Sequence, residues 1–194
     1  MTSTAGNLHV VRCGSSELIC RPFVKEAFEH NAYELLWLAA SVVGNRMDAE
    51  TCLADAVRLA EGAVYVAPAW RDLWMKRCVV QAAIERARKE IRAIAFSYPP
   101  GCVSYRPSAL LSESERKSLR TYSAEKITDS SNVFECAALM MHGYLGFSTY
   151  DCAISMGCHH STIEPACSNA ASRILRERTH PLEGDWPRIF EAIA

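Results

Sequence analysis

The segment from Trp70 to Arg92 constrains the fold more than any other stretch, because its apolar residues recur at helical spacing. One apolar stripe follows steps of three, four or seven and comprises Leu73, Val80, Ile84, Ala87, Ile91 and Ile94. A second line at the same spacing, about 100° around the helix, comprises Trp74, Cys78, Gln81, Glu85, Arg88 and Arg92. The segment is therefore predicted to be a helix with one face in a core and a second, polar face.

The second face combines residue types that suit contact with nucleic acid. An aromatic ring can stack on an unpaired base, an amide can read a base edge, and guanidinium groups can hold phosphate. Further positive charge lies at the flanks, on Lys76, Arg77, Arg86 and Lys89. For this helix taken alone, the simpler interpretation is a solvated face with a partly buried tryptophan.

Composition narrows the class of protein. The 194 residues allow one large or two small domains, and 49 % of them are apolar, which is enough for a sizeable core. The formal net charge of −1 argues against a protein that coats nucleic acid without specificity. Because there is neither a bilayer-spanning apolar run nor a signal peptide, we expect a soluble cytoplasmic protein with no membrane partner. The nine scattered cysteines favour reduced thiols over a disulfide framework.

Two further helices are predicted upstream of this segment. Residues 22–43 follow helical spacing, and Gly44 stands where a glycine commonly ends a helix. Asp48 is predicted as the N-cap of a helix from Ala49 to about Gly62.

In this order, the segments FEHNAYELLWLAASVVGNRMDAETCLADAVRLA and WMKRCVVQAAIERARK resemble region two of the extracytoplasmic-function sigma factors, which are small bacterial RNA polymerase subunits. The matching positions are Asp48, Ala49, Glu50, Trp74, Gln81, Glu85 and Arg88. Two polar positions of the family are replaced by Thr51 and Ala54, and Gln81 stands where the family usually has asparagine.

The resemblance implies two sets of binding residues in this first part of the chain. Contacts to the RNA polymerase core are expected from Asp48, Glu50, Asp55 and Arg58. Contacts to promoter DNA are expected from Trp74, Arg77, Gln81, Arg88 and Lys89. The Thr51 and Ala54 replacements predict a weaker affinity for the core enzyme.

The second half of the chain has the pattern of a helix-turn-helix. A capping box at Ser112 and Glu115 predicts a short helix through Arg120, and residues 133–145 form the next helix, ended by Gly146. Further predicted features are a Ser148 cap, a helix from Thr149 to Met156, a turn at Gly157, and a Ser161 or Thr162 cap for a helix over 163–177. A short helix, a glycine turn and a longer helix, in this order, are the elements of a helix-turn-helix.

The stretch YLGFSTYDCAISMGCHHSTIEPACSNAASRIL resembles region four of the same sigma family. The resemblance implies DNA contacts by Thr162 and Arg173. Glu164, Ala166 and Asn169 stand where the family carries basic residues. Because each lost phosphate contact weakens binding, the promoter contacts of this module are predicted to be weak.

Other chemistry is less well supported by the sequence. The cluster Cys152, Cys158, His159, His160 and Cys167 matches no standard zinc-site spacing, so no metal ligand is assigned. There is no Gly-rich phosphate loop and no obvious carboxylate pair, so neither a cofactor nor a catalytic residue is predicted and the protein is not expected to be an enzyme.

We therefore predict an all-α protein with two helical domains. The domain boundaries are an N-terminal extension at 1–21, a region-two-like bundle at 22–95, a linker at 96–130, a helix-turn-helix domain at 131–178 and a tail at 179–194. The resemblance implies a sigma factor whose partners are core polymerase and promoter DNA, with an anti-sigma protein as an open further partner. The alternatives are a sigma-like interaction module that has lost promoter recognition, and a thiol or metal sensor suggested only by the cysteine count.

Overall fold

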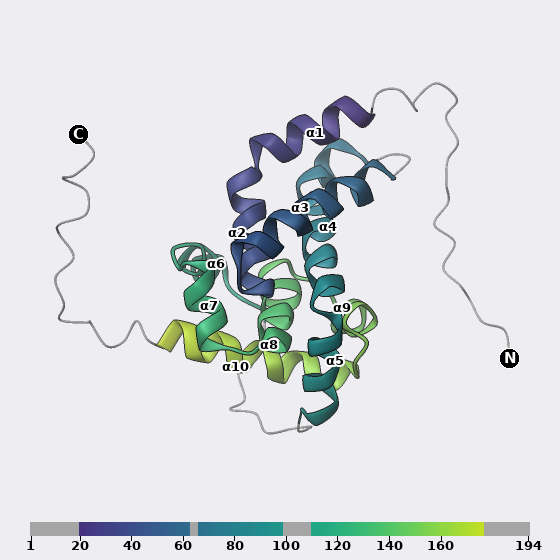
Figure 1. Cartoon of the computed structure of the whole chain (residues 1–194). Helices are drawn as coiled ribbons and strands as arrows, with labels where there is room; N and C mark the ends of the chain where they lie inside the picture. The colour runs from purple at the N-terminus through teal and green to yellow at the C-terminus, as the bar shows by residue number, and fades with distance from the viewer. Residues whose placement is uncertain (1–19, 63–65, 99–109, 177–194) are drawn as a thin grey trace, which may run out of the picture.

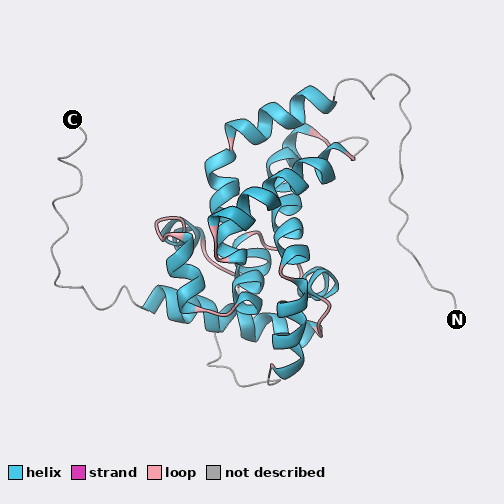
Figure 2. Cartoon of the chain, viewed as in Figure 1, coloured by secondary structure: helices cyan, strands magenta, loops and turns pink. Residues whose placement is uncertain are grey.

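The computed structural model describes residues 20–62, 66–98 and 110–176, and within these ranges the chain is helical with no strand (Figure 2). The predicted all-α class is confirmed for this part of the chain. The predicted N-terminal extension, apart from Cys20 and Arg21, and the predicted tail at 179–194 lie outside the described residues. Among the described helices, none is long and apolar enough to cross a membrane.

The first part of the chain forms a bundle. Its helices are α1 (Cys20–His30), α2 (Ala32–Val43), α3 (Arg46–Glu61), the 3-10 turn η1 (Pro68–Trp70), α4 (Arg71–Arg86) and α5 (Arg88–Ser97). The single helix predicted over 22–43 is two helices that meet at Asn31, whose side-chain amide donates to the Ala27 carbonyl at 2.8 Å. Gly44 ends α2 with φ +79°, as predicted.

The start of α3 differs from the sequence prediction. The helix begins at Arg46, and its N-cap is Asn45, whose side-chain oxygen accepts the backbone N–H of Asp48 at 2.8 Å. Asp48 therefore lies in the first turn rather than at the cap, where its negative charge still favours the helix N-terminus. Asparagine and aspartate are about equally good caps, so the sequence did not distinguish the two.

The long helix predicted over 70–92 is interrupted. The backbone of Ala87 (φ −90°, ψ 6°) separates α4 from α5, although its N–H still bonds to the Ala83 carbonyl at 3.0 Å. The predicted apolar stripe continues across this break, since Val80, Ile84 and Ile91 are all buried. The two helices thus present one core-facing line despite the change in backbone conformation.

The predicted linker is partly structured. The Ser112–Glu115 capping box is present and begins α6 (Glu113–Leu119). A helix that the sequence analysis did not predict follows, α7 (Ala124–Ser130), and its Ile127 is fully buried. Because α7 packs against α2, this part of the linker belongs to the folded body (Figure 1).

The second half begins with α8 (Val133–Ala138), which passes into the π-helical segment η2 (Leu139–Tyr144) and ends near Gly146 at φ +76°. The helix-turn-helix elements follow as predicted: α9 (Thr149–Met156) is capped by Ser148, and Gly157 turns the chain at φ +68°. A 3-10 turn, η3 (His160–Thr162), precedes α10 (Ile163–Arg176). His159 caps η3, because its side chain accepts the Ser161 N–H.

The core is one cluster that runs through both halves of the described chain. It includes Leu35, Leu38, Ile84, Phe134 and Ile174, and α10 crosses beneath α8 (Figure 1). Between the halves, the rings of Trp37 and Tyr144 meet edge to face at 5.5 Å, and the Trp37 indole donates to the Tyr122 carbonyl at 3.0 Å. The division into two separate helical domains consequently stays a prediction.

A polar junction also joins the halves at Glu34 of α2. This carboxylate accepts the Lys76 ammonium at 3.0 Å, the Arg120 guanidinium at 2.7 Å and the Tyr144 hydroxyl at 3.1 Å. Lys76 is only 8 % exposed, so its charge needs Glu34 and its second carboxylate partner, Asp72, which lies 2.9 Å away. The junction fixes the position of α4 against the residues that follow α6.

Candidate nucleic-acid interface

Part of the predicted polar face lies on α4 and the start of α5, and together with the flanking Arg77 we call it the α4–α5 stripe. It comprises Trp74, Arg77, Gln81, Glu85 and Arg88, of which Arg77, Gln81 and Glu85 are exposed and Trp74 and Arg88 are partly buried. Cys78, which the sequence analysis placed on this face, is instead 2 % exposed and belongs to the core. The reason is angular, because Cys78 lies roughly 60° around the helix from Gln81, toward the buried side.

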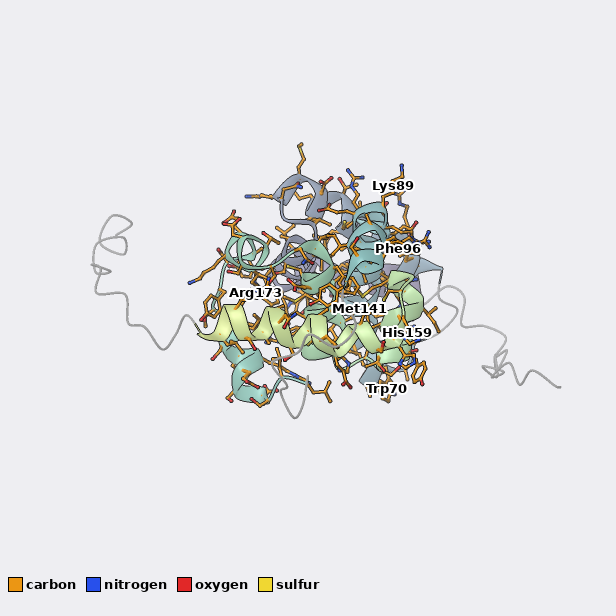
Figure 3. The ribbon with its side chains drawn as sticks, turned by 90° about the horizontal axis from the view of Figure 1, so that it is seen from below. Trp70, Lys89, Phe96, Met141, His159 and Arg173 are labelled. Atoms are coloured by element: carbon orange, nitrogen blue, oxygen red, sulfur yellow. The ribbon has the colours of Figure 1, made fainter. Side chains whose placement is uncertain are left out.

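Positive charge surrounds the stripe at its α5 end. Lys89 and Arg92 are exposed, and Arg88 forms an ion pair with Glu85 one turn away. Figure 3 shows Lys89 at the outer edge of the molecule, apart from α10. The indole N–H of Trp74 is buried without a hydrogen-bond partner among the described residues, so this ring is anchored by apolar packing alone.

The second half of the chain contacts the edge of this stripe. The guanidinium of Arg77 lies 5.4 Å from the centre of the Phe147 ring, a cation–π distance. Arg92 approaches the backbone at Gly157 so closely that a Cβ there would be 2.8 Å from its Nε. Glycine at position 157 thus permits both the left-handed turn and the close approach of the Arg92 side chain from α5.

The predicted polymerase-binding residues lie on α3, and they are largely paired with one another or with neighbours. Asp48 accepts the Arg86 Nε at 2.8 Å, Arg46 pairs with Glu50 at 2.8 Å, and Asp55 pairs with Arg58. The Asn45 amide and the Arg86 guanidinium lower the pKa of Asp48 from its ordinary value.

The same helix exposes apolar side chains that sequence reasoning missed. Met47 is 80 % exposed and Leu59 is 47 % exposed, and Ala54 is exposed as well. Their exposure depends on which face of α3 packs on α2 and α4, and the helical spacing of this segment alone does not decide that. The solvent side of α3 therefore carries apolar as well as charged side chains.

The predicted DNA-binding residues of the second half have partners inside the molecule. Thr162 is 6 % exposed, and its hydroxyl donates to the His159 carbonyl at 2.7 Å. Arg173 makes two bonds of 2.8 Å to Glu135, a carboxylate that is 2 % exposed. Neither side chain is free to contact DNA without giving up an internal bond.

Tyr98 and Glu135 are the structurally important residues that sequence reasoning did not find. The Tyr98 hydroxyl donates to Glu135 at 3.0 Å and accepts the Asn169 amide at 2.6 Å. Burial raises the pKa of Tyr98 to about 12, and the nearby Glu135 charge acts in the same direction. No sequence signal links these residues, because Tyr98 and Asn169 are 71 positions apart.

The residues of the candidate metal-binding cluster lie on α9, on η3 and the turn before it, and on α10. Within the described ranges, no three side chains of histidine, cysteine, aspartate or glutamate gather as metal ligands would. Cys152 and Cys167 are fully buried, and burial raises the pKa of the Cys152 thiol to about 12. His160 stacks instead on Tyr150, with ring centres 4.6 Å apart.

Comparisons of the chain with protein-family models, with curated proteins and with solved structures found no match.

Proposed function

We propose that the protein is a divergent sigma factor of the extracytoplasmic-function type, which binds the RNA polymerase core through α3 and promoter DNA through the α4–α5 stripe. The observation that carries the proposal is the solvent exposure of Gln81 in line with Arg77, beside the exposed cations Lys89 and Arg92. An amide within a cationic line suits a base edge next to phosphates.

The surface of α3 supports the first of these contacts. Exposed Met47 and Leu59 supply apolar area, while Glu50 and Arg58 hold ion pairs that are open to water. Exposed ion pairs are worth little to the fold, so a partner can replace them at small cost. This arrangement suits docking on another protein.

The second half contributes little to DNA binding in this proposal. Thr162 and Arg173 are engaged internally, and Glu164 adds an exposed negative charge at the start of α10. DNA recognition would then depend mainly on the first half of the chain.

One observation favours a second candidate, a sigma-like interaction module that no longer starts transcription. The continuous core and the Glu34 junction join the halves into one body, in which helix-turn-helix residues serve the fold. Such a protein would still bind the polymerase core through α3.

Run-off transcription with purified core polymerase on a library of promoters tests the proposal. A sigma factor gives discrete transcripts, and Gln81→Ala combined with Lys89→Ala removes them while core binding persists. Asp129→Ala on α7 is the matched control, because Asp129 is exposed and far along the chain from the stripe. If the protein binds core polymerase but forms no open complex, the result would support the interaction module instead of the sigma factor.

A further inference from the structure

A cavity of about 180 Å³ lies where α4 and α6 meet the end of η2, and we call it the α4–α6 pocket. A single water molecule needs roughly 10–15 Å³, and sites for larger organic ligands begin near roughly 300 Å³, so this pocket suits a small ligand. None of its lining residues belongs to the α4–α5 stripe. Its charged lining side chains are Asp72, Lys76, Glu113, Arg116, Lys117 and Arg120.

This lining has a surplus of positive charge, because four of its side chains are cations and two are carboxylates. The charged residues of α6 and of its C-cap, Arg120, recur at steps of three and four, so they lie on one face of the helix. Lys76 joins them from α4. The cationic character of the pocket therefore depends on the local pattern of α6 and on the fold, which brings α4 to that face.

Two of the four cations are paired. The Lys76 ammonium binds Asp72 at 2.9 Å and Glu34 at 3.0 Å, and the Arg120 guanidinium binds Glu34 at 2.7 Å. An ammonium has three N–H donors, so the two carboxylates leave one donor of Lys76 for a further acceptor. Because Lys76 is only 8 % exposed, water has little access to that donor.

The other two cations, Arg116 and Lys117, form no ion pair with any of the described residues. The Nε of Arg116 donates to the carbonyl of buried Leu111 at 3.1 Å, which holds the guanidinium in place and leaves its terminal nitrogens available. Lys117 is exposed and has all three donors available. Like charges gathered in one pocket repel one another, and a bound anion would offset this repulsion.

We propose that the α4–α6 pocket binds a small, multiply charged anion of the phosphate class, either free or as the diphosphate group of a nucleotide. A guanidinium fork fits two phosphate oxygens, and an ammonium adds a point charge, so Arg116 and Lys117 are suited to such a ligand. The two charges without a partner match a ligand with at least two negative charges. The bound anion contacts Lys76 of the first half and α6 of the second, so it stabilises the folded chain. This inference does not depend on the proposed function.

Isothermal titration of the full-length chain with sodium pyrophosphate at constant ionic strength tests the proposal. Lys117→Gln should weaken the affinity roughly tenfold, because it removes a charge-assisted contact. Lys89→Gln is the matched control, since Lys89 is also exposed and the charge change is the same, and it should leave the affinity unchanged. Arg116→Gln should weaken binding as Lys117→Gln does. ADP is titrated in parallel: an affinity at least equal to that of pyrophosphate supports a nucleotide ligand, and a weaker one supports the free anion.

Protection from acetylation locates the bound anion. Pyrophosphate should slow the acetylation of Lys117 several-fold and leave the rate at Lys89 unchanged, as measured by mass spectrometry. The proposal would be overturned by the absence of saturable binding in the millimolar range, or by equal affinities of Lys117→Gln and Lys89→Gln. Protection of Lys117 by a single-stranded oligonucleotide but not by pyrophosphate would also overturn it, because the surface would then bind nucleic acid.

Discussion

Arg88 and Arg173 show how similar exposure can hide different roles. Their side chains are 42 % and 49 % exposed, and each is paired with a glutamate. Glu85, the partner of Arg88, is 60 % exposed, so water can replace the pair and a phosphate can compete for the arginine. Glu135, the partner of Arg173, is 2 % exposed and would be left as a buried charge. The environment of the partner thus decides which arginine is available.

At this scale we predict that Arg88→Ala with Lys89→Ala lowers DNA affinity more than Arg173→Ala does. Removal of two cations should also reduce the slope of log affinity against log salt by about 1 to 2. A salt titration by fluorescence anisotropy measures both quantities. Arg173→Ala should leave the slope nearly unchanged, and circular dichroism must show that it folds, because it leaves Glu135 without its guanidinium. Equal losses in the two variants would contradict the prediction.

Among the elements, several helix ends were predictable, whereas the interruptions at Asn31 and Ala87 were not. The caps at Ser112 and Ser148 and the turns at Gly44 and Gly157 depend on residues within one or two helical turns, so local sequence indicates them. No proline or glycine stands at Ala87, so the sequence does not indicate a break there. The break allows α5 to pack along α8. Tertiary packing overrode a continuous helical pattern there.

Gly157→Ala should destabilise the protein by about 1–2 kcal/mol, since an L-residue at φ +68° takes the left-handed conformation. The new Cβ would also push Arg92 aside. Gly62→Ala is the control, because Gly62 caps α3 at φ −72° and a Cβ there would come no closer than 3.4 Å to the Leu59 carbonyl oxygen, so it should be neutral or slightly stabilising. Urea unfolding measures both, and equal effects of the two substitutions would refute the argument.

At the scale of the whole molecule, buried thiols are distributed through the shared core. Burial raises the pKa of Cys52 and Cys78 in the first half to about 11, and that of Cys136 in the second half to about 12. A raised pKa means that the folded state favours the protonated thiol. The stabilisation is therefore complete below about pH 9, the ordinary thiol value, and is lost as the pH rises through the folded values.

We expect the free energy of unfolding to fall between pH 9 and pH 11, with both halves unfolding together. Alkylation of Cys52 reports the first half and alkylation of Cys136 reports the second, each detected by mass spectrometry. Coincident urea transitions with the two probes would agree with one shared core. Separate transitions, or a stability that does not change over this pH range, would contradict it.

The sequence by itself determined that the described chain is helical, where most helices begin and end, and which line of α4 faces the core. These features depend on side-chain periodicity and on capping within a few residues, which are local properties of the chain. Only the tertiary structure decided that Arg173 is held by Glu135, that Asn169 donates to Tyr98, and that both halves share one core. Those contacts join residues 38 to 71 positions apart, and their energy depends on burial, which no local pattern contains.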